Sequence, residues 1–167
     1  TLVPEAGTER LRKVINKEME EDQLLRDIEN LLDSGWDAFK LYFMIGLPTE
    51  TQEDIDGIIS LCQRVLALSK NKNKNKRIRR VSVSLSPFVP KPHTPFQWLP
   101  QEELASLKEK LRYLRHRLKD NRLMVRWQLP EISLLEATIA LGDRKLALVI
   151  EKAYNLGCRF DSWSDRL

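Results

Sequence analysis

The sequence predicts an α/β fold built on a parallel sheet, and two observations support this. Short apolar runs alternate along the chain with longer segments whose apolar residues recur at helical spacing. One run, residues 38–47, is apolar and aromatic without a helical period, which is typical of a strand buried on both faces of a parallel sheet. Alternation of this kind favours βαβ units, whose crossovers make the strands parallel.

Three helices are predicted in the first seventy residues. Thr8 is a suitable N-cap for a helix that runs to about residue 16. A second helix covers residues 20–32 and ends before Gly35, at a position where positive φ is common. The third begins at Thr49 or Thr51, and its first turn is rich in acidic residues.

The rest of the chain begins with a strand and continues mainly as helices. Residues 80–88 alternate apolar and polar side chains, as a strand does, and a proline-rich extended segment follows. A charged amphipathic helix is predicted over 102–118, a short strand around 125–127, and two final helices over 133–140 and 144–156.

Composition is that of a folded, water-soluble chain of 167 residues, with 42% apolar and 31% charged residues. No apolar run reaches the roughly 18 residues of a membrane helix, and the first residues do not form a signal peptide, so we expect no membrane partner and a cytoplasmic location. The chain opens at Thr1 within a predicted strand end, which favours a fragment of a longer protein.

The net charge of +4 comes largely from a lysine- and asparagine-rich run over residues 70–77. Such a run is typical of a solvated loop. Contact with RNA phosphates is an alternative, although no aromatic residue in the run could stack on bases. Cys62 and Cys158 are predicted to be reduced thiols, because neither has metal-ligand spacing to another cysteine or histidine.

Three segments leave predicted strand ends, and parallel α/β folds bind ligands at the carboxyl ends of their strands. These segments are residues 4–8, 44–50 and 86–95. Glycines in the first two would let the backbone approach a ligand closely, and prolines in the third would fix an extended array of carbonyls. Together they predict a site for a molecule that is partly polar and partly flat.

The same segments resemble radical S-adenosylmethionine proteins. Residues 5–12 (Glu-Ala-Gly-Thr-Glu-Arg-Leu-Arg), followed by Asn-Lys at 16–17, are similar to the Glu-Ser-Gly-Ser…Asn-Lys signature of that superfamily. Residues 42–51 (Tyr-Phe-Met-Ile-Gly-Leu-Pro-Thr-Glu-Thr) resemble its Gly-Leu-Pro-Gly-Glu-Thr strand-to-helix turn, and residues 86–95 resemble the proline-rich end of its last barrel strand. The order of the three elements also matches.

A narrower resemblance covers nearly the whole chain. Residues 88–98, 133–137, 141–144 and 160–163 are similar to a group of cobalamin-domain-containing radical proteins, also described as iron–sulfur oxidoreductases. Where related sequences tend to have His-Asp, this chain has Gln128-Leu129.

The resemblance implies a fold and a division of the chain. It implies the C-terminal half of a partial (β/α)6 TIM-like barrel, with strand ends near residues 1–5, 38–47 and 80–88. The barrel half would occupy residues 1–122, and a helical extension would occupy 123–167.

The resemblance also implies a cofactor site for S-adenosylmethionine. Glu5 would accept hydrogen bonds from the ribose or the methionyl amine, residues of the second strand end would pack on adenine, and the third would read the adenine edge. Glu5 could instead be a helix first-turn acid, and the two residues before Gly46 could be plain core. The residues that the resemblance assigns to cofactor binding are Glu5, Gly7, Thr8, Met44, Ile45, Gly46, Pro87 and Phe88.

The chain lacks the Cys-x3-Cys-x2-Cys motif of the superfamily. The resemblance therefore implies that the ligands of the 4Fe-4S cluster lie in a missing N-terminal barrel half, and that this chain alone is inactive. The parent would form a 5′-deoxyadenosyl radical, or methylate or otherwise modify a substrate, with or without cobalamin. The alternative is a non-catalytic binding or interaction module, facing RNA through the lysine-rich loop or self-associating through an open sheet edge.

Overall fold

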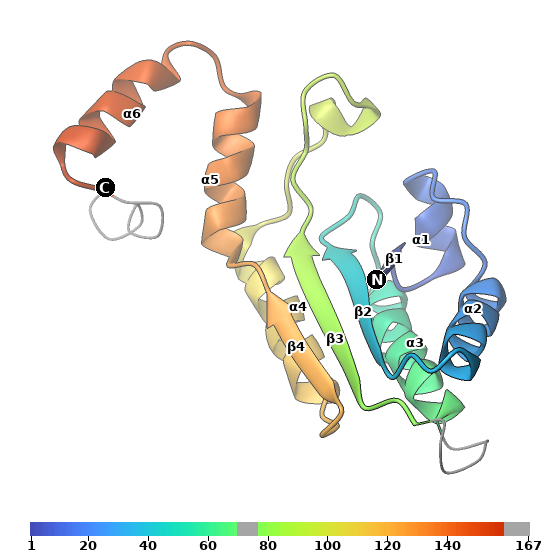
Figure 1. Ribbon diagram of the computed structural model, residues 1–167. Helices are drawn as coiled ribbons and strands as arrows, with labels where there is room; N and C mark the ends of the chain where they lie inside the picture. Colours follow the sequence, from blue (N-terminus) through green and yellow to red (C-terminus); the bar gives the residue numbers. More distant parts are fainter. Residues whose placement is uncertain (70–76, 159–167) are drawn as a thin grey trace.

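The protein is an α/β fold, as predicted, in a computed structural model that describes residues 1–69 and 77–158 (Figure 1). Its sheet has four parallel strands in the order β1-β2-β3-β4. The strands are β1 (Leu2–Glu5), β2 (Ala38–Ile45), β3 (Arg80–Pro87) and β4 (Leu123–Trp127). The lysine-rich run up to residue 76, predicted as a solvated loop with RNA contact as the alternative, lies outside the described residues, as do residues 160–163.

Helices connect each strand to the next. The helices are α1 (Glu9–Val14), α2 (Glu21–Asp33), α3 (Gln52–Leu68), η1 (Pro95–Trp98), α4 (Leu104–Arg117), α5 (Pro130–Leu141) and α6 (Leu146–Asn155), where η1 is a 3-10 helix. The helices α2, α3 and α4 pack side by side along one face of the sheet, with α3 in contact with the other two (Figure 1). Because every predicted helix and strand is present, the periodicity of the sequence was a sufficient guide to the elements.

Local signals explain where the helices begin and end. The Thr8 hydroxyl accepts a hydrogen bond from the Leu11 amide at 3.2 Å, so Thr8 is the predicted N-cap of α1. Thr51, rather than Thr49, caps α3, and it forms a reciprocal capping box with Asp54. Gly35, at φ +92°, follows the end of α2 as predicted.

The main core lies between the helices and one face of the sheet. Alternate residues of β2 and β3 point into it, and those helix-facing residues are Phe39, Leu41, Phe43, Ile45, Val81, Val83 and Leu85. The expectation that residues 38–47 are buried on both faces is wrong, since Lys40 is exposed and Tyr42 is 38% exposed. Apolar runs alone cannot distinguish two covered faces from one, because an exposed tyrosine still counts as apolar.

The sheet continues past the predicted boundary between residues 122 and 123. β4 pairs in parallel with β3, from Val81 beside Leu123 to Leu85 beside Trp127. On the helix side, the guanidinium of Arg115 lies 4.0 Å from the centre of the Trp127 ring. A cation–π contact of this kind stabilises the docking of α4 on the last strand.

The carboxyl ends of the strands gather the irregular segments. In Figure 1 the arrowheads of β2, β3 and β4 point toward the end of the molecule where α1, η1 and α5 lie. A second apolar cluster is located at this end, and it comprises Ala6, Leu11, Leu47 and Phe88, with Ile15, Met44 and Phe96 against it.

Both cysteines are free, as predicted. Among residues 1–69 and 77–158, no helix has the length and apolar character needed to cross a membrane.

Candidate functional site

A cavity of about 410 Å³ lies at the carboxyl ends of β2, β3 and β4. Residues of the open sheet face, the proline-rich segment and α5 surround it. The cavity is lined by Met44, Ser86, Pro87, Phe88, Val89, Lys91, Thr94, Phe96, Gln128 and Glu136. Five of these ten side chains are apolar and form most of the cavity surface, so the cavity could take a flat ring and present polar groups at its margin.

The apolar wall is built around Phe88. Its ring meets that of Phe96 edge to face, with centroids 5.7 Å apart and planes at 86°. This pair folds η1 back over the end of β3, and Met44 packs against the same cluster. Aromatic pairs in this geometry stabilise by about 1 kcal/mol beyond the area they bury.

The polar margin joins the proline-rich segment to α5. Lys91 forms an ion pair with Glu136, which also accepts a hydrogen bond from the Gln128 amide at 3.3 Å. The ion pair holds the pKa of Glu136 below its usual range. The carboxylate is therefore charged at neutral pH, but Lys91 and Gln128 already engage it.

A buried hydrogen bond to the backbone secures the base of this segment. The Gln101 amide donates to the Phe88 carbonyl at 3.0 Å and to the Ser133 hydroxyl at 3.1 Å. Ser133, which is fully buried, donates to the Pro130 carbonyl at 2.7 Å. Through these bonds the position of Phe88 is coupled to the start of α5.

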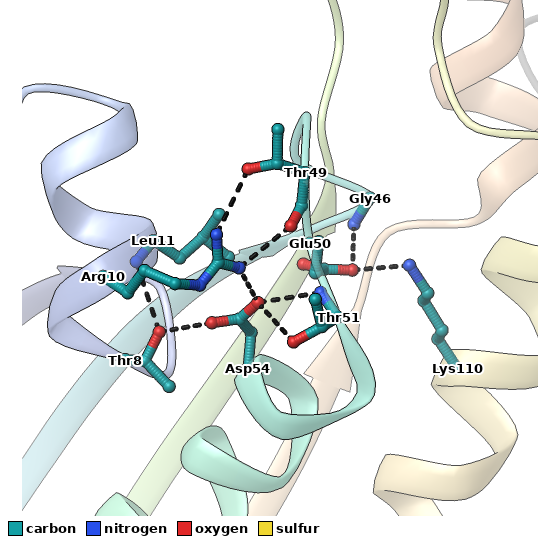
Figure 2. Close-up of polar contacts among 9 residues, drawn as sticks. All are labelled: Thr8, Arg10, Leu11, Gly46, Thr49, Glu50, Thr51, Asp54 and Lys110. Atoms are coloured by element: carbon teal, nitrogen blue, oxygen red, sulfur yellow. Dashed lines mark hydrogen bonds and ion pairs between the residues drawn. The ribbon is translucent and has the colours of Figure 1, made fainter.

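A second group of polar contacts ties the first two strand ends together (Figure 2). Asp54, which is 1% exposed, accepts hydrogen bonds from the hydroxyls of Thr8 and Thr51 and forms an ion pair with Arg10. Arg10 also donates to the Thr49 carbonyl at 2.9 Å. Burial alone would raise the pKa of Asp54, but these donors outweigh it and lower the pKa. Asp54 is thus a charged anchor between the two turns.

Direct contact between backbones makes the same junction tight. A Cβ atom on Gly7 would lie 2.0 Å from the Asp54 carbonyl oxygen, and one on Gly57 would lie 2.5 Å from the Gly7 oxygen. Glycine at both positions lets the turn after β1 rest on α3. Gly7 was expected to let the backbone approach a ligand, but the close approach that the structure shows is to α3.

The buried Arg12 supports this turn from below. It is fully buried and donates to the Ala6 carbonyl at 2.8 Å, with Glu21 3.6 Å from its second terminal nitrogen. Burying a guanidinium with so few partners costs folding free energy, and its hydrogen bond to the Ala6 carbonyl fixes the backbone there. Arg12 therefore holds the turn that follows Glu5.

The turn after β2 is fixed by a third carboxylate. Glu50 accepts from the Gly46 amide at 2.9 Å and from Lys110 at 2.6 Å, and Lys110 also reaches Glu102 at 2.7 Å (Figure 2). Glu50 is 2% exposed, and its second carboxylate oxygen has no hydrogen-bond partner within the described ranges. Burial raises the pKa of Glu50 in spite of Lys110, whereas the two carboxylates raise the pKa of Lys110.

Two non-glycine residues in the segments at the ends of β1 and β2, residues 4–8 and 44–50, have backbone conformations that favour glycine. Glu5, the last residue of β1, has φ +67°, and Thr49 has φ +66°. Left-handed conformations cost non-glycine residues about 1–3 kcal/mol, and they are common at ligand-binding sites. Both residues lie where strand ends give way to turns, and Thr49 borders a hollow beside Lys110, but neither residue lines the cavity at the ends of β2, β3 and β4.

The structure brings some of the predicted site residues together and separates others. Met44, Pro87 and Phe88 line one cavity. The Ile45 side chain is fully buried in the main core. Gly7 and Thr8 line a separate hollow of about 460 Å³ against α3, and Gly46 lines another, of about 510 Å³, beside Lys110. Glu5 ends β1 and is no part of α1.

The residues that join these segments have no such role predicted from the sequence, and they are Arg10, Arg12, Asp54, Gln101, Lys110 and Glu136. A signal existed for Asp54, since Thr51 and Asp54 have the spacing of a capping box. The other partners are far apart in the sequence. Within residues 1–69 and 77–158, no group of three histidine, cysteine or acidic side chains is placed to hold a metal ion.

Comparison with known proteins gives one curated relative. The chain is 37% identical over 159 residues to Uncharacterized protein MJ0966 of Methanocaldococcus jannaschii. The match covers 93% of this chain and 32% of that protein, so the chain spans about a third of its relative's length. No family model matches the chain, and no solved structure matches it.

Proposed function

We propose that this chain is the C-terminal half of a radical S-adenosylmethionine barrel and that it contacts S-adenosylmethionine. The half that binds the 4Fe-4S cluster would be a separate segment. The cavity at the carboxyl ends of β2, β3 and β4 carries the proposal. Two of the three segments that resemble the superfamily meet in its wall, and an apolar cavity of about 410 Å³ suits an adenine ring.

The conformation of one turn supports the resemblance independently. Thr49 stands where the superfamily turn has its second glycine, and Thr49 has φ +66°. Glycine adopts this conformation without strain, which explains a glycine preference at the position. The resemblance thus extends from residue types to the backbone shape that those residues require.

The sheet topology supports the barrel. Consecutive strands are neighbours, and α2, α3 and α4 cover the same face. A barrel wound in one direction has this order, with its helices outside and the other face of its sheet around the lumen. The first strand is also placed to accept a further strand, since β1 pairs only with β2 within the described residues and a cavity of about 850 Å³ borders residues 1–3.

The residues of this chain suit S-adenosylmethionine but not a 4Fe-4S cluster. Met44, Phe88 and Phe96 would enclose the adenine of S-adenosylmethionine. Glu5, at the end of β1, does not line this cavity, and its role as acceptor of hydrogen bonds from the ribose or amine rests on the resemblance. When bound, S-adenosylmethionine supplies the adenosyl radical or the methyl group. A 4Fe-4S cluster does not fit, because three thiolates are needed and the chain has two cysteines, one of them buried.

Calorimetric titration with S-adenosylhomocysteine tests the proposal. The chain is expected to bind with weak saturable affinity, and Glu5→Ala to weaken binding at least tenfold. The control is Glu109→Ala, which removes an exposed carboxylate of α4 that lines none of the cavities. The same titration is repeated with the proposed cluster-bearing half restored, and absence of binding there would refute the proposal.

A further inference from the structure

The face of the sheet opposite the helices is polar and cationic. Counting from the amino ends of the strands, its side chains fall into rows across β2, β3 and β4 because the strands pair in register. The rows are Ala38 and Arg80, then Lys40, Ser82 and Met124, then Tyr42, Ser84 and Arg126, then Met44, Ser86 and Gln128. The last of these rows lies in the candidate cofactor cavity.

The middle row has a distinct chemistry. Tyr42 and Ser84 offer hydroxyl groups, and the exposed Arg126 guanidinium lies 3.5 Å from the sulfur of Met124. By strand geometry the row is about 10 Å wide and lies about 7 Å below the cavity row. Its side chains could therefore reach one small ligand that also touches the cavity.

Charge on this face is unbalanced. Lys40, Arg80 and Arg126 form no ion pair among the described residues. The nearest acidic groups along the strands are at the margins, where Asp37 pairs with Arg79 and Glu136 pairs with Lys91. Within β2, β3 and β4, this face has hydroxyls and cations but no carboxylate.

These features restrict what can cover the face. Parallel sheets are normally covered on both faces, yet an apolar layer here would bury three unpaired cations at a cost of several kcal/mol each. An anionic occupant that accepts hydrogen bonds satisfies the guanidinium and the hydroxyls together. Arg126 can bind a phosphate or carboxylate group through two parallel hydrogen bonds, as guanidinium groups do.

We infer that the row of Tyr42, Ser84 and Arg126 is a substrate subsite for a phosphate- or carboxylate-bearing small molecule. The inference rests on the proposed function, because that function makes this face the lumen of a barrel and the adjoining cavity its cofactor site. Arg126 would recognise the anionic group, while Tyr42 and Ser84 would donate hydrogen bonds to it.

Amide NMR spectra of the 167-residue chain test the subsite, with inorganic pyrophosphate and citrate titrated separately at constant ionic strength. We expect one of them to shift the amides of β3 and β4 around Ser84 and Arg126 most strongly. Arg126→Gln should weaken this binding at least tenfold and Tyr42→Phe several-fold. Arg112→Gln, a matched change on the exposed face of α4, should leave affinity within twofold.

Several results would overturn the inference. One is that neither anion binds, as expected if an acidic protein segment rather than a small molecule belongs on the face. Another is that shifts spread over the arginines of α4, or survive Arg126→Gln in a folded protein. S-adenosylhomocysteine titrated into the same samples separates the two proposals. If S-adenosylhomocysteine binds and neither anion does, only the proposed subsite is refuted. If an anion binds at the row and S-adenosylhomocysteine does not bind, the assignment of the row as a substrate subsite is refuted.

Discussion

Gly57→Ala should destabilise the protein, although the same substitution stabilises most helices. Gly57 lies within α3, where replacing glycine by alanine ordinarily contributes about 1 kcal/mol. Here the new Cβ would lie 2.5 Å from the Gly7 oxygen, 2.8 Å from the Gly7 carbonyl carbon and 3.0 Å from Thr8 Cγ2. Two of these atoms belong to backbone, so a side-chain rotation cannot relieve the overlap.

The magnitude follows from what must move. To clear the Cβ, the turn after β1 would have to shift away from α3 by about half an ångström or more, given the roughly 3 Å minimum for such contacts. Overpacking of this kind costs about 1–3 kcal/mol, and weakening a hydrogen bond to the charged Asp54 costs about 1.5–3 kcal/mol. After the helical gain of about 1 kcal/mol is subtracted, the free energy of unfolding should fall by about 1.5–5 kcal/mol.

Urea denaturation of the chain measures this change. Gln63→Ala is the control, because Gln63 is an exposed residue of the same helix and its replacement should change stability by less than about 0.5 kcal/mol. The decisive quantity is the sign for Gly57→Ala. A variant more stable than the wild type would show that the turn does not rest on α3, and the account of Gly7 and Asp54 would be refuted.

Three other predictions concern ionisable and sulfur groups. Burial raises the pKa of Glu50 above its unfolded value of 4.5, so ionisation of Glu50 destabilises the folded state as pH rises through that value. In urea denaturation, the stability of Glu50→Gln relative to wild type should therefore increase from pH 4 to pH 7.5, and a constant difference would contradict this. Burial raises the pKa of the Cys62 thiol to about 12, so Ellman's reagent should modify half-buried Cys158 in the native protein and Cys62 only after denaturation; fast native reaction of Cys62 would be inconsistent with its position in the core. The chain should retain no stoichiometric iron and sulfide after anaerobic incubation and desalting, and a stoichiometric cluster would show that the ligands lie within it.

The sequence was most informative where structure is set by near neighbours. The alternation of residues 80–88 and the stripe of residues 20–32 each reflect which side chains face the core, so β3 and α2 could be predicted from period alone. Caps were also predictable, because Thr8 and Thr51 bond to residues three positions away. The fourth strand could be expected as an element but not as a partner of β3, since pairing is a long-range property.

The contacts at the candidate site were less predictable for the same reason. Thr8 and Asp54 are 46 residues apart, and Lys110 is 60 residues from Glu50. Neither pair has a periodic signal, and each exists only because the sheet places successive turns beside one another. Glycines gave a partial signal: the sequence marked Gly7 as a place of close approach, but only the fold identifies α3 as what approaches it.

The two faces of β3 differ in chemistry, and this difference indicates what kind of partner could cover the open face of the sheet. Its helix side carries Val81, Val83 and Leu85, each buried, and its other side carries Ser82, Ser84 and Ser86. Serines shed little apolar surface when covered, so the hydrophobic effect gives the open face little tendency to bind an apolar partner. Small hydroxyl side chains do allow a ligand to approach the strands closely and to find hydrogen-bond donors there. Since the same face also carries unpaired cations, electrostatic complementarity rather than burial of apolar area should select its occupant.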